Sequence, residues 1–199
     1  MLRVAVLIAS LLAADVTVAA AQNQVRIRGT LESATEQAMT IKSRDGQTVI
    51  VTLAPSLVVV AVSKAALGDI KSGSFVGAAA LQQPDGTFKA QEVVVFPEAM
   101  RGTGEGHYPW DLSPGSTMTN AAVDALVSGN DGTALTLKHK DGEVKVVVPR
   151  NAPIVTLGPG DKKLLVPGAG VFVPASRAAD GALTTGRVLV GRDGLMPPM

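Results

Sequence analysis

The sequence predicts an all-β protein of two tandem small β-barrels, each of about six short strands, arising from an internal duplication. Three observations predict it. Apolar and polar residues alternate, as in Val25–Glu32, with the period of a half-buried strand. Asp-Gly pairs such as Asp45-Gly46 separate apolar runs and predict tight hairpin turns, because these residues accept positive φ angles. The same pattern then returns further along the chain.

The internal repeat aligns with a single one-residue gap. Residues 38–51 and 134–147 share a Thr-(Ile/Leu)-Lys strand, an Asp-Gly turn and a valine-rich strand, at an offset of 96 residues. Residues 73–95 and 168–190 share a glycine, a second Asp-Gly turn and a final valine run, at an offset of 95 residues. Because these features recur in the same order, they indicate a duplication rather than a chance match.

The first copy shows how each repeat is expected to fold. A single helical turn at Ser63–Leu67, capped by Ser63, is expected between the fourth and fifth strands. One sandwich in which both copies share a core is the alternative architecture. Domains this small are marginally stable alone, which favours packing of the two copies against each other. The expected strands are Val25–Glu32, Thr40–Lys42, Gln47–Leu53, Leu57–Val62, Phe75–Leu81 and Thr87–Phe96.

The N-terminus has the pattern of a secretory signal peptide. Arg3 precedes the apolar run Val4–Leu12, and small residues lead to a cleavage site expected after Ala21. The run is too short to cross a bilayer, so no membrane span is expected. The C-terminal segment, which contains two prolines, is expected to be a frayed tail. The expected divisions are a signal peptide (1–21), a first repeat (22–97), a linker (98–118), a second repeat (119–192) and a tail (193–199).

The amino-acid composition limits the cellular compartments and the classes of binding partner that are expected. The chain has no cysteine, which excludes disulfides and thiolate metal sites and, with an export signal, favours a bacterial periplasmic or secreted protein. A net charge of +1 without a basic stripe argues against nucleic acid as a partner. Aromatic residues make up only 3% of the chain, so stacking platforms for bases or sugars are scarce.

Together, these motifs resemble a known group. The pattern Val-x-Gly-x-Leu-(Glu/Asp), Thr-(Ile/Leu)-Lys, Asp-Gly, Val-x-Val and (Ile/Leu)-Lys-x-Gly-x-x-Val, followed by a second Asp-Gly, runs from Val25 to Val95. It is similar to the small OB-like barrel domains of a family of exported bacterial proteins of unknown function. The resemblance implies OB-like barrels in the cell envelope and carries over no catalytic residue.

The linker concentrates the rare residues of the chain. It holds the only Trp, the only Tyr and one of the two His. Arg101, His107, Tyr108 and Trp110 are therefore candidates for binding an envelope protein, a glycan or a small ligand, because binding residues often lie on loops carried by rigid scaffolds. Alternatively, the aromatic side chains simply anchor the connector by packing on a barrel.

Met100, His107 and Met118 form a candidate metal site. Thioether and imidazole ligands together suit copper, which would be the cofactor in that case. Spacings of seven and eleven residues, with glycines between, do not fix a coordination geometry. His139 is a more remote fourth candidate.

Catalytic motifs are not found. The glycines of residues 102–106 lack the flanking strand and helix of a dinucleotide-binding loop. The sequence also contains no Gly-x-Ser-x-Gly, Ser-x-x-Lys or His-Glu-x-x-His motif. A non-enzymatic role is therefore expected.

Overall fold

The computed structural model of the chain describes residues 23–129 and 132–199, so the expected signal peptide and its cleavage site lie outside the described residues. The all-β prediction is confirmed. The strands are β1 (Asn23–Ala34), β2 (Ala38–Ser43), β3 (Thr48–Lys64), β4 (Phe75–Gln82), β5 (Phe88–Val95), β6 (Gly106–Pro109), β7 (Ser116–Gly129), β8 (Gly132–His139), β9 (Gly142–Val148), β10 (Ile154–Pro159), β11 (Gly170–Arg177) and β12 (Leu183–Gly191). Three 3-10 turns join them, η1 (Leu67–Asp69), η2 (Glu98–Met100) and η3 (Lys162–Leu164).

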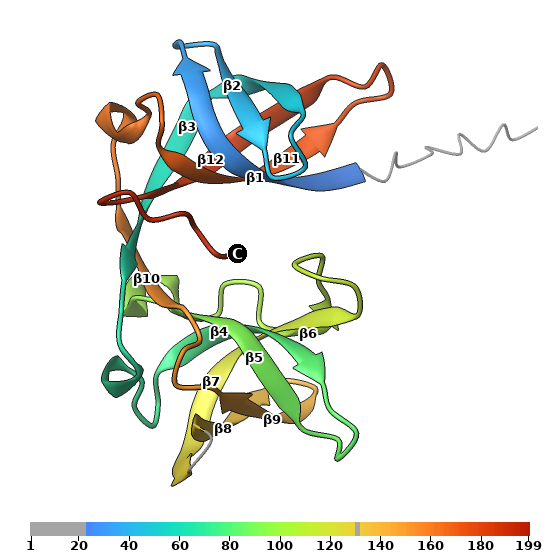
Figure 1. Cartoon of the computed structure of the whole chain (residues 1–199), viewed down its shortest axis with the longest axis vertical. Coiled ribbons are helices and arrows are strands. Elements are labelled where there is room, and N and C mark those ends of the chain that lie inside the picture. Colours follow the sequence, from blue (N-terminus) through green and yellow to red (C-terminus); the bar gives the residue numbers. More distant parts are fainter. Residues whose placement is uncertain (1–22, 130–131) are drawn as a thin grey trace, which may run out of the picture.

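The strands close into two rings, drawn one above the other in Figure 1. The first barrel contains β1, β2, β3, β12 and β11; it closes where β11 pairs antiparallel with β1 and β12 pairs parallel with β3. The second barrel contains β4, β5, β9, β8 and β7; it closes through a short parallel contact of β5 with β9. Each ring therefore has five strands, not six.

The prediction of one barrel per repeat is wrong, because each ring takes strands from both halves of the chain. The cause lies in β3. Two strands were expected on either side of Pro55, but β3 runs unbroken for 17 residues and leaves the first barrel. Its pairing with β12 shifts register between Leu53 and Val58, and such an irregularity tolerates a proline. The hairpin β4–β5 thus forms away from β1–β3, and β11–β12 takes its place.

A two-stranded connection joins the barrels. The last part of β3 pairs antiparallel with β10, Val62 opposite Leu157, and β10 also pairs in parallel with β5. Figure 1 shows both strands running from one barrel to the other. The helical turn expected at Ser63–Leu67 begins later, at Leu67, because Ser63 and Lys64 still belong to β3. No helix among the described residues has the length and apolar character needed to cross a bilayer.

The element order of the first half recurs in the second. η1, β4 and β5 begin at residues 67, 75 and 88, and η3, β11 and β12 begin at residues 162, 170 and 183, which is 95 residues later each time. The equivalent hairpins complete opposite barrels: β4–β5 lies in the second and β11–β12 in the first. The offset found in the sequence is thus the offset between structurally equivalent strands.

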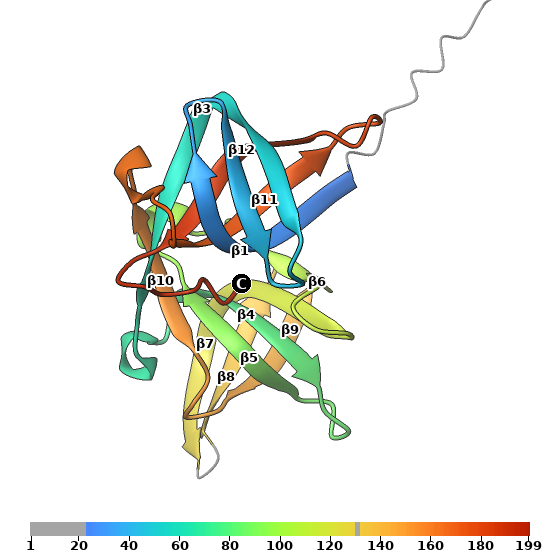
Figure 2. The same cartoon turned by 45° about the horizontal axis from the view of Figure 1, so that its top comes forward.

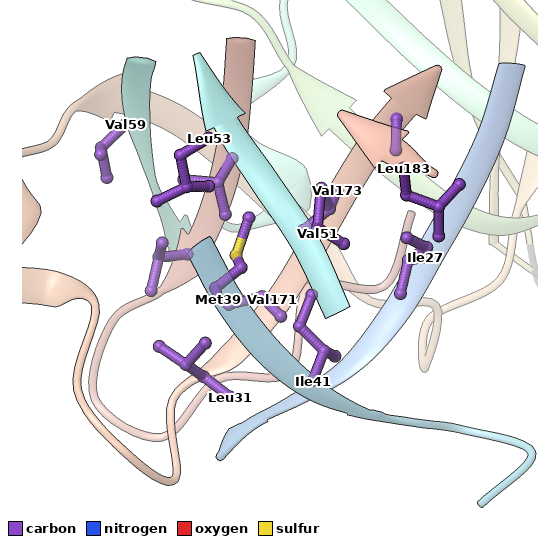
Figure 3. Packing of buried hydrophobic residues seen from close by; sticks show 13 residues of the cluster. Ile27, Leu31, Met39, Ile41, Val51, Leu53, Val59, Val171, Val173 and Leu183 are labelled. Atoms are coloured by element: carbon purple, nitrogen blue, oxygen red, sulfur yellow. The ribbon is translucent and has the colours of Figure 1, made fainter. Parts of the chain in front are cut away.

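Both barrels have aliphatic interiors. Figure 3 shows the first, in which Leu31, Met39, Ile41 and Val51 meet side chains from β11 and β12. A matching cluster fills the second barrel. A third cluster lies between the barrels and is called the seam here. It consists of Val60, Val62, Val94, Val155, Leu157, Phe172, Leu189 and Met199, with Phe96, Met100, Trp110 and Leu195 packed against it.

The C-terminal segment is part of this seam, so the prediction of a frayed tail is wrong. Figure 2 shows the segment running between the two barrels. Met199 is only 6% exposed, and its carbonyl accepts a hydrogen bond from Nε of Arg28. Pro197 accepts another from Arg44 at 3.1 Å. The prolines prevent regular structure, as expected, but tertiary contacts hold the segment in place.

Candidate functional site in the seam

The predicted linker folds as a short ribbon. After η2, strand β6 pairs antiparallel with β7, with Tyr108 opposite Met118 and His107 opposite Thr119. Neighbouring residues of a strand point to opposite faces, and directly paired residues share a face. Tyr108 and Met118 therefore lie on one face of the ribbon, and His107 lies on the other.

The face of Tyr108 borders a hollow of about 210 Å³ in the seam, called the seam hollow here. Its walls are mostly apolar and come from both barrels and the linker. They include Val60, Val94, Phe96, Leu157, Phe172, Leu189, Met100, Met118 and Met199. Thr103, whose hydroxyl donates to the carbonyl of Met100, and the exposed Arg187 also line the hollow. Three further polar side chains lie in its walls, Asn120, Tyr108 and Trp110.

Asn120 is the most constrained of these three. It is 7% exposed; its Nδ2 donates to the carbonyl of Thr103 at 3.0 Å and to the hydroxyl of Tyr108 at 3.2 Å. Its Oδ1 has no hydrogen-bond partner. The residue opposite it on β4 is Gly77, where a Cβ atom would lie only 2.5 Å from Oδ1. Glycine at this position thus leaves room for the buried carbonyl oxygen of Asn120.

Trp110 supplies the second unpaired polar atom, because its Nε1 is buried without an acceptor. The guanidinium of Arg26 lies 3.9 Å from the centre of the indole ring, a cation–π geometry. The rings of Tyr108 and Phe172 lie 6.1 and 6.4 Å away. These contacts fix the indole and leave its N–H available as a donor.

Tyr108 adds a hydroxyl. Burial raises its pKa, and the nearby charge of Arg26 opposes that shift only in part. The phenol therefore stays protonated at neutral pH. Since its oxygen already accepts from Asn120, its proton remains available to a further acceptor. Trp110, Tyr108 and Asn120 together thus carry two donors and one acceptor without a partner.

His107 lies away from the hollow. Its Nδ1 lies 2.8 Å from the hydroxyl of Thr119, and its ring lies 5.1 Å from Phe88 and 6.5 Å from His139. Burial, and then the proximity of His139, lowers its pKa. The structure therefore does not bring His107 together with Met100 and Met118, the other proposed metal ligands.

Arg101 is also remote from the hollow, since it pairs with Glu98 and donates to the carbonyl of Gly73 at 2.8 Å. Of the predicted site residues, Tyr108, Trp110, Met100 and Met118 line one hollow. Within residues 23–129 and 132–199, no three His, Cys, Asp or Glu side chains are grouped so that they could hold a metal ion.

Sequence reasoning missed Asn120 and the contribution of Phe172 and Met199. One signal was present for the first of these, because a carboxamide stands in the middle of an otherwise small and apolar strand, Met118 to Val123. Phe172 and Met199 carried no such signal, since only the exchange of hairpins between the barrels brings them to the linker.

Comparison of the chain with known protein families, with curated proteins and with solved structures finds no match. The resemblance to exported OB-like domains therefore stays a prediction, and function is inferred from the site.

Proposed function

We propose that the protein acts by binding rather than by catalysis, and that the seam hollow takes a small, mostly apolar molecule ending in a group that both donates and accepts hydrogen bonds. A primary amide and a hydroxyl are such groups. The single observation that carries this proposal is the pair of buried, unpartnered atoms on two residues that line the hollow, Trp110 Nε1 and Asn120 Oδ1.

Buried polar atoms without partners are costly, at about 1–3 kcal/mol each, so nearly all are paired in folded proteins. Here two residues that line one mostly apolar hollow, Trp110 and Asn120, carry a buried N–H donor and a buried carbonyl acceptor, both unpaired. A ligand that hydrogen-bonds to both would recover that cost, and the surrounding side chains, Phe172 and Leu189 among them, would bury its apolar part. Among the described lining residues, no nucleophile stands beside a base, which supports binding over catalysis.

The single tryptophan makes the proposal directly testable, because Trp110 is itself part of the hollow. Benzamide and benzyl alcohol, which carry the required end groups, would be titrated while indole emission is recorded and heat is measured by calorimetry. Toluene is the matched probe without a polar end. We expect saturable binding of the first two and at least about fivefold weaker binding of toluene.

Variants locate the site. Tyr108→Phe removes the hydroxyl, together with the hydrogen bond that it accepts from Asn120, and should weaken binding of benzamide by about fivefold. His107→Ala, on the opposite face of the same strand, is the control and should leave binding unchanged. Absence of saturable binding by both polar probes, or equal binding of toluene, would overturn the proposal.

We also propose that the protein is exported to a bacterial periplasm or beyond. The support is the signal-peptide pattern of residues 1–21 and the absence of cysteine from the sequence. Expression of the full chain in a Gram-negative host, followed by fractionation and mass measurement, tests it. A cytoplasmic protein of uncleaved mass would contradict this proposal.

A further inference from the structure

A second hollow, of about 470 Å³, opens beside the first barrel and is called the arginine hollow here. Four arginines from three places in the chain line it, together with two acidic residues. These residues are Arg26 and Arg28 of β1, Arg44 of the β2–β3 turn, Arg177 of β11, Asp45 and Asp111. The arginine hollow is distinct from the seam hollow, although Arg26 also stacks on Trp110.

The acidic residues offset only part of this positive charge. Asp111 lies 2.7 Å from Nη2 of Arg28 and 3.6 Å from Nη1 of Arg26, and thus serves both. Asp45 is engaged by the hydroxyl of Ser43. In the described part of the chain, neither Arg44 nor Arg177 forms an ion pair.

Two of the guanidinium groups lie close to each other and are partly buried. The side chain of Arg28 is only 9% exposed, and burial, followed by the charge of Arg28, lowers the pKa of Arg44. The main-chain oxygens of Met199 and Pro197 accept hydrogen bonds from Arg28 and Arg44 and hold the two side chains in place. Arg44 thus lies beside a second cation and, within the described ranges, has no carboxylate partner.

A third carboxyl faces these arginines without neutralising them. Glu92 of β5 is completely buried, and neither of its oxygens has a hydrogen-bond partner. Burial raises its pKa to about 8, against the opposing charges of Arg28 and Arg44, so it is mostly protonated at neutral pH. The positive charge of the hollow is thus available to an incoming anion.

We propose that the arginine hollow binds a tetrahedral oxyanion, as free phosphate or sulfate or as a phosphate ester. Guanidinium groups donate paired N–H bonds that match the oxygens of such anions. A tetrahedral anion presents several acceptor oxygens in different directions, and arginines converge here from β1, from the β2–β3 turn and from β11. A planar carboxylate would engage fewer of them.

Calorimetric titration of the full chain at constant ionic strength, with chloride as the balancing anion, tests the site. The probes are inorganic phosphate, sulfate and glycerol phosphate, the last of which separates an ester from the free anion. We expect saturable binding of at least one of the three. Arg44→Gln should weaken it by about tenfold, because a charge-assisted contact is lost.

Two further variants keep the test falsifiable. Asp111→Asn removes the resident competing carboxylate and should tighten binding. Arg150→Gln removes the same charge as Arg44→Gln at an exposed turn residue outside the hollow, and should change nothing. Equal weakening by Arg44→Gln and Arg150→Gln, or no binding beyond that of chloride, would overturn the proposal. Thermal unfolding of each variant confirms that it is folded.

Discussion

The interiors of the two barrels and the seam between them are built from different side chains. Each interior is filled by aliphatic residues and one or no methionine. The seam contains three aromatic residues, Phe96, Trp110 and Phe172, and two methionines, Met100 of the linker and Met199 of the C-terminal segment. In the described ranges, the buried side-chain nitrogen and oxygen atoms that lack a hydrogen-bond partner also lie beside the seam. They belong to Glu92, Trp110 and Asn120.

Glu92 belongs to the seam because of the pleat of β5. Val93 points into the second barrel, so its neighbours Glu92 and Val94 face outward, and Val94 is a seam residue. The aliphatic interiors of the barrels therefore stabilise the fold, whereas the unsatisfied buried polar groups lie at the seam. Unsatisfied buried polar groups are more frequent at binding sites than elsewhere, and both proposed sites adjoin the seam.

The largest expected effect concerns the exchange of hairpins between the barrels. Residues 23–97 expressed alone contain β1–β3 of one ring and β4–β5 of the other, so neither barrel can close within the fragment. We expect this fragment to be unfolded, and the full chain to unfold in one transition. Circular dichroism and amide-proton dispersion measure both. A folded fragment would restore the arrangement of one barrel per repeat.

Glu92→Gln is expected to have the next largest effect, on the pH dependence of stability. The pKa of Glu92 is about 8 in the folded state against 4.5 as the ordinary value, so the folded state retains a proton that the unfolded state loses. The stability of the parent protein should fall between pH 5 and pH 8 by an amount on the order of 4 kcal/mol. Urea unfolding at several pH values should show this fall in the parent and not in Glu92→Gln.

Two methionines of the C-terminal segment allow a buried position in the seam to be compared with an exposed position nearby. Met199 is buried, whereas Met196 is 38% exposed. Met199→Ala should lower the free energy of unfolding by about 2 kcal/mol, and Met196→Ala by less than about 0.5 kcal/mol. Chemical denaturation of both variants measures the difference. Equal small losses would mean that the segment is frayed after all.

Local patterns in the sequence predicted the strands well. The Asp-Gly pairs at residues 45–46 and 85–86 do form the turns of β2–β3 and β4–β5, and the all-β class follows from alternation. What the patterns did not specify was the partner of each hairpin. Because the repeats are alike, β4–β5 and β11–β12 present similar edges, and the unbroken course of β3 past Pro55 decides between them.

The candidate sites were predictable to different degrees. The concentration of rare residues in the linker directed attention to Tyr108 and Trp110, which line the seam hollow. The sequence alone did not predict the arginine hollow, because the alternation of Val25–Glu32 places Arg26 and Arg28 on the solvent-exposed face of a half-buried strand. Burial of that face depends on Asp111 and the C-terminal segment, both remote in sequence.

The smallest expected effect links Glu92 to the arginine hollow. Sulfate keeps its charge across the range from pH 6 to pH 9.5. The pKa of the Asp111 carboxyl is lowered: burial raises it, but the hydrogen bond from Arg28 and the charges of Arg28 and Arg26 outweigh burial. Ionisation of Glu92 near pH 8 adds a negative charge beside Arg28 and Arg44 and should weaken sulfate binding by about fivefold. In Glu92→Gln the affinity should not vary with pH. A parallel decline in both proteins would assign the effect to another group and separate the buried carboxyl from anion binding.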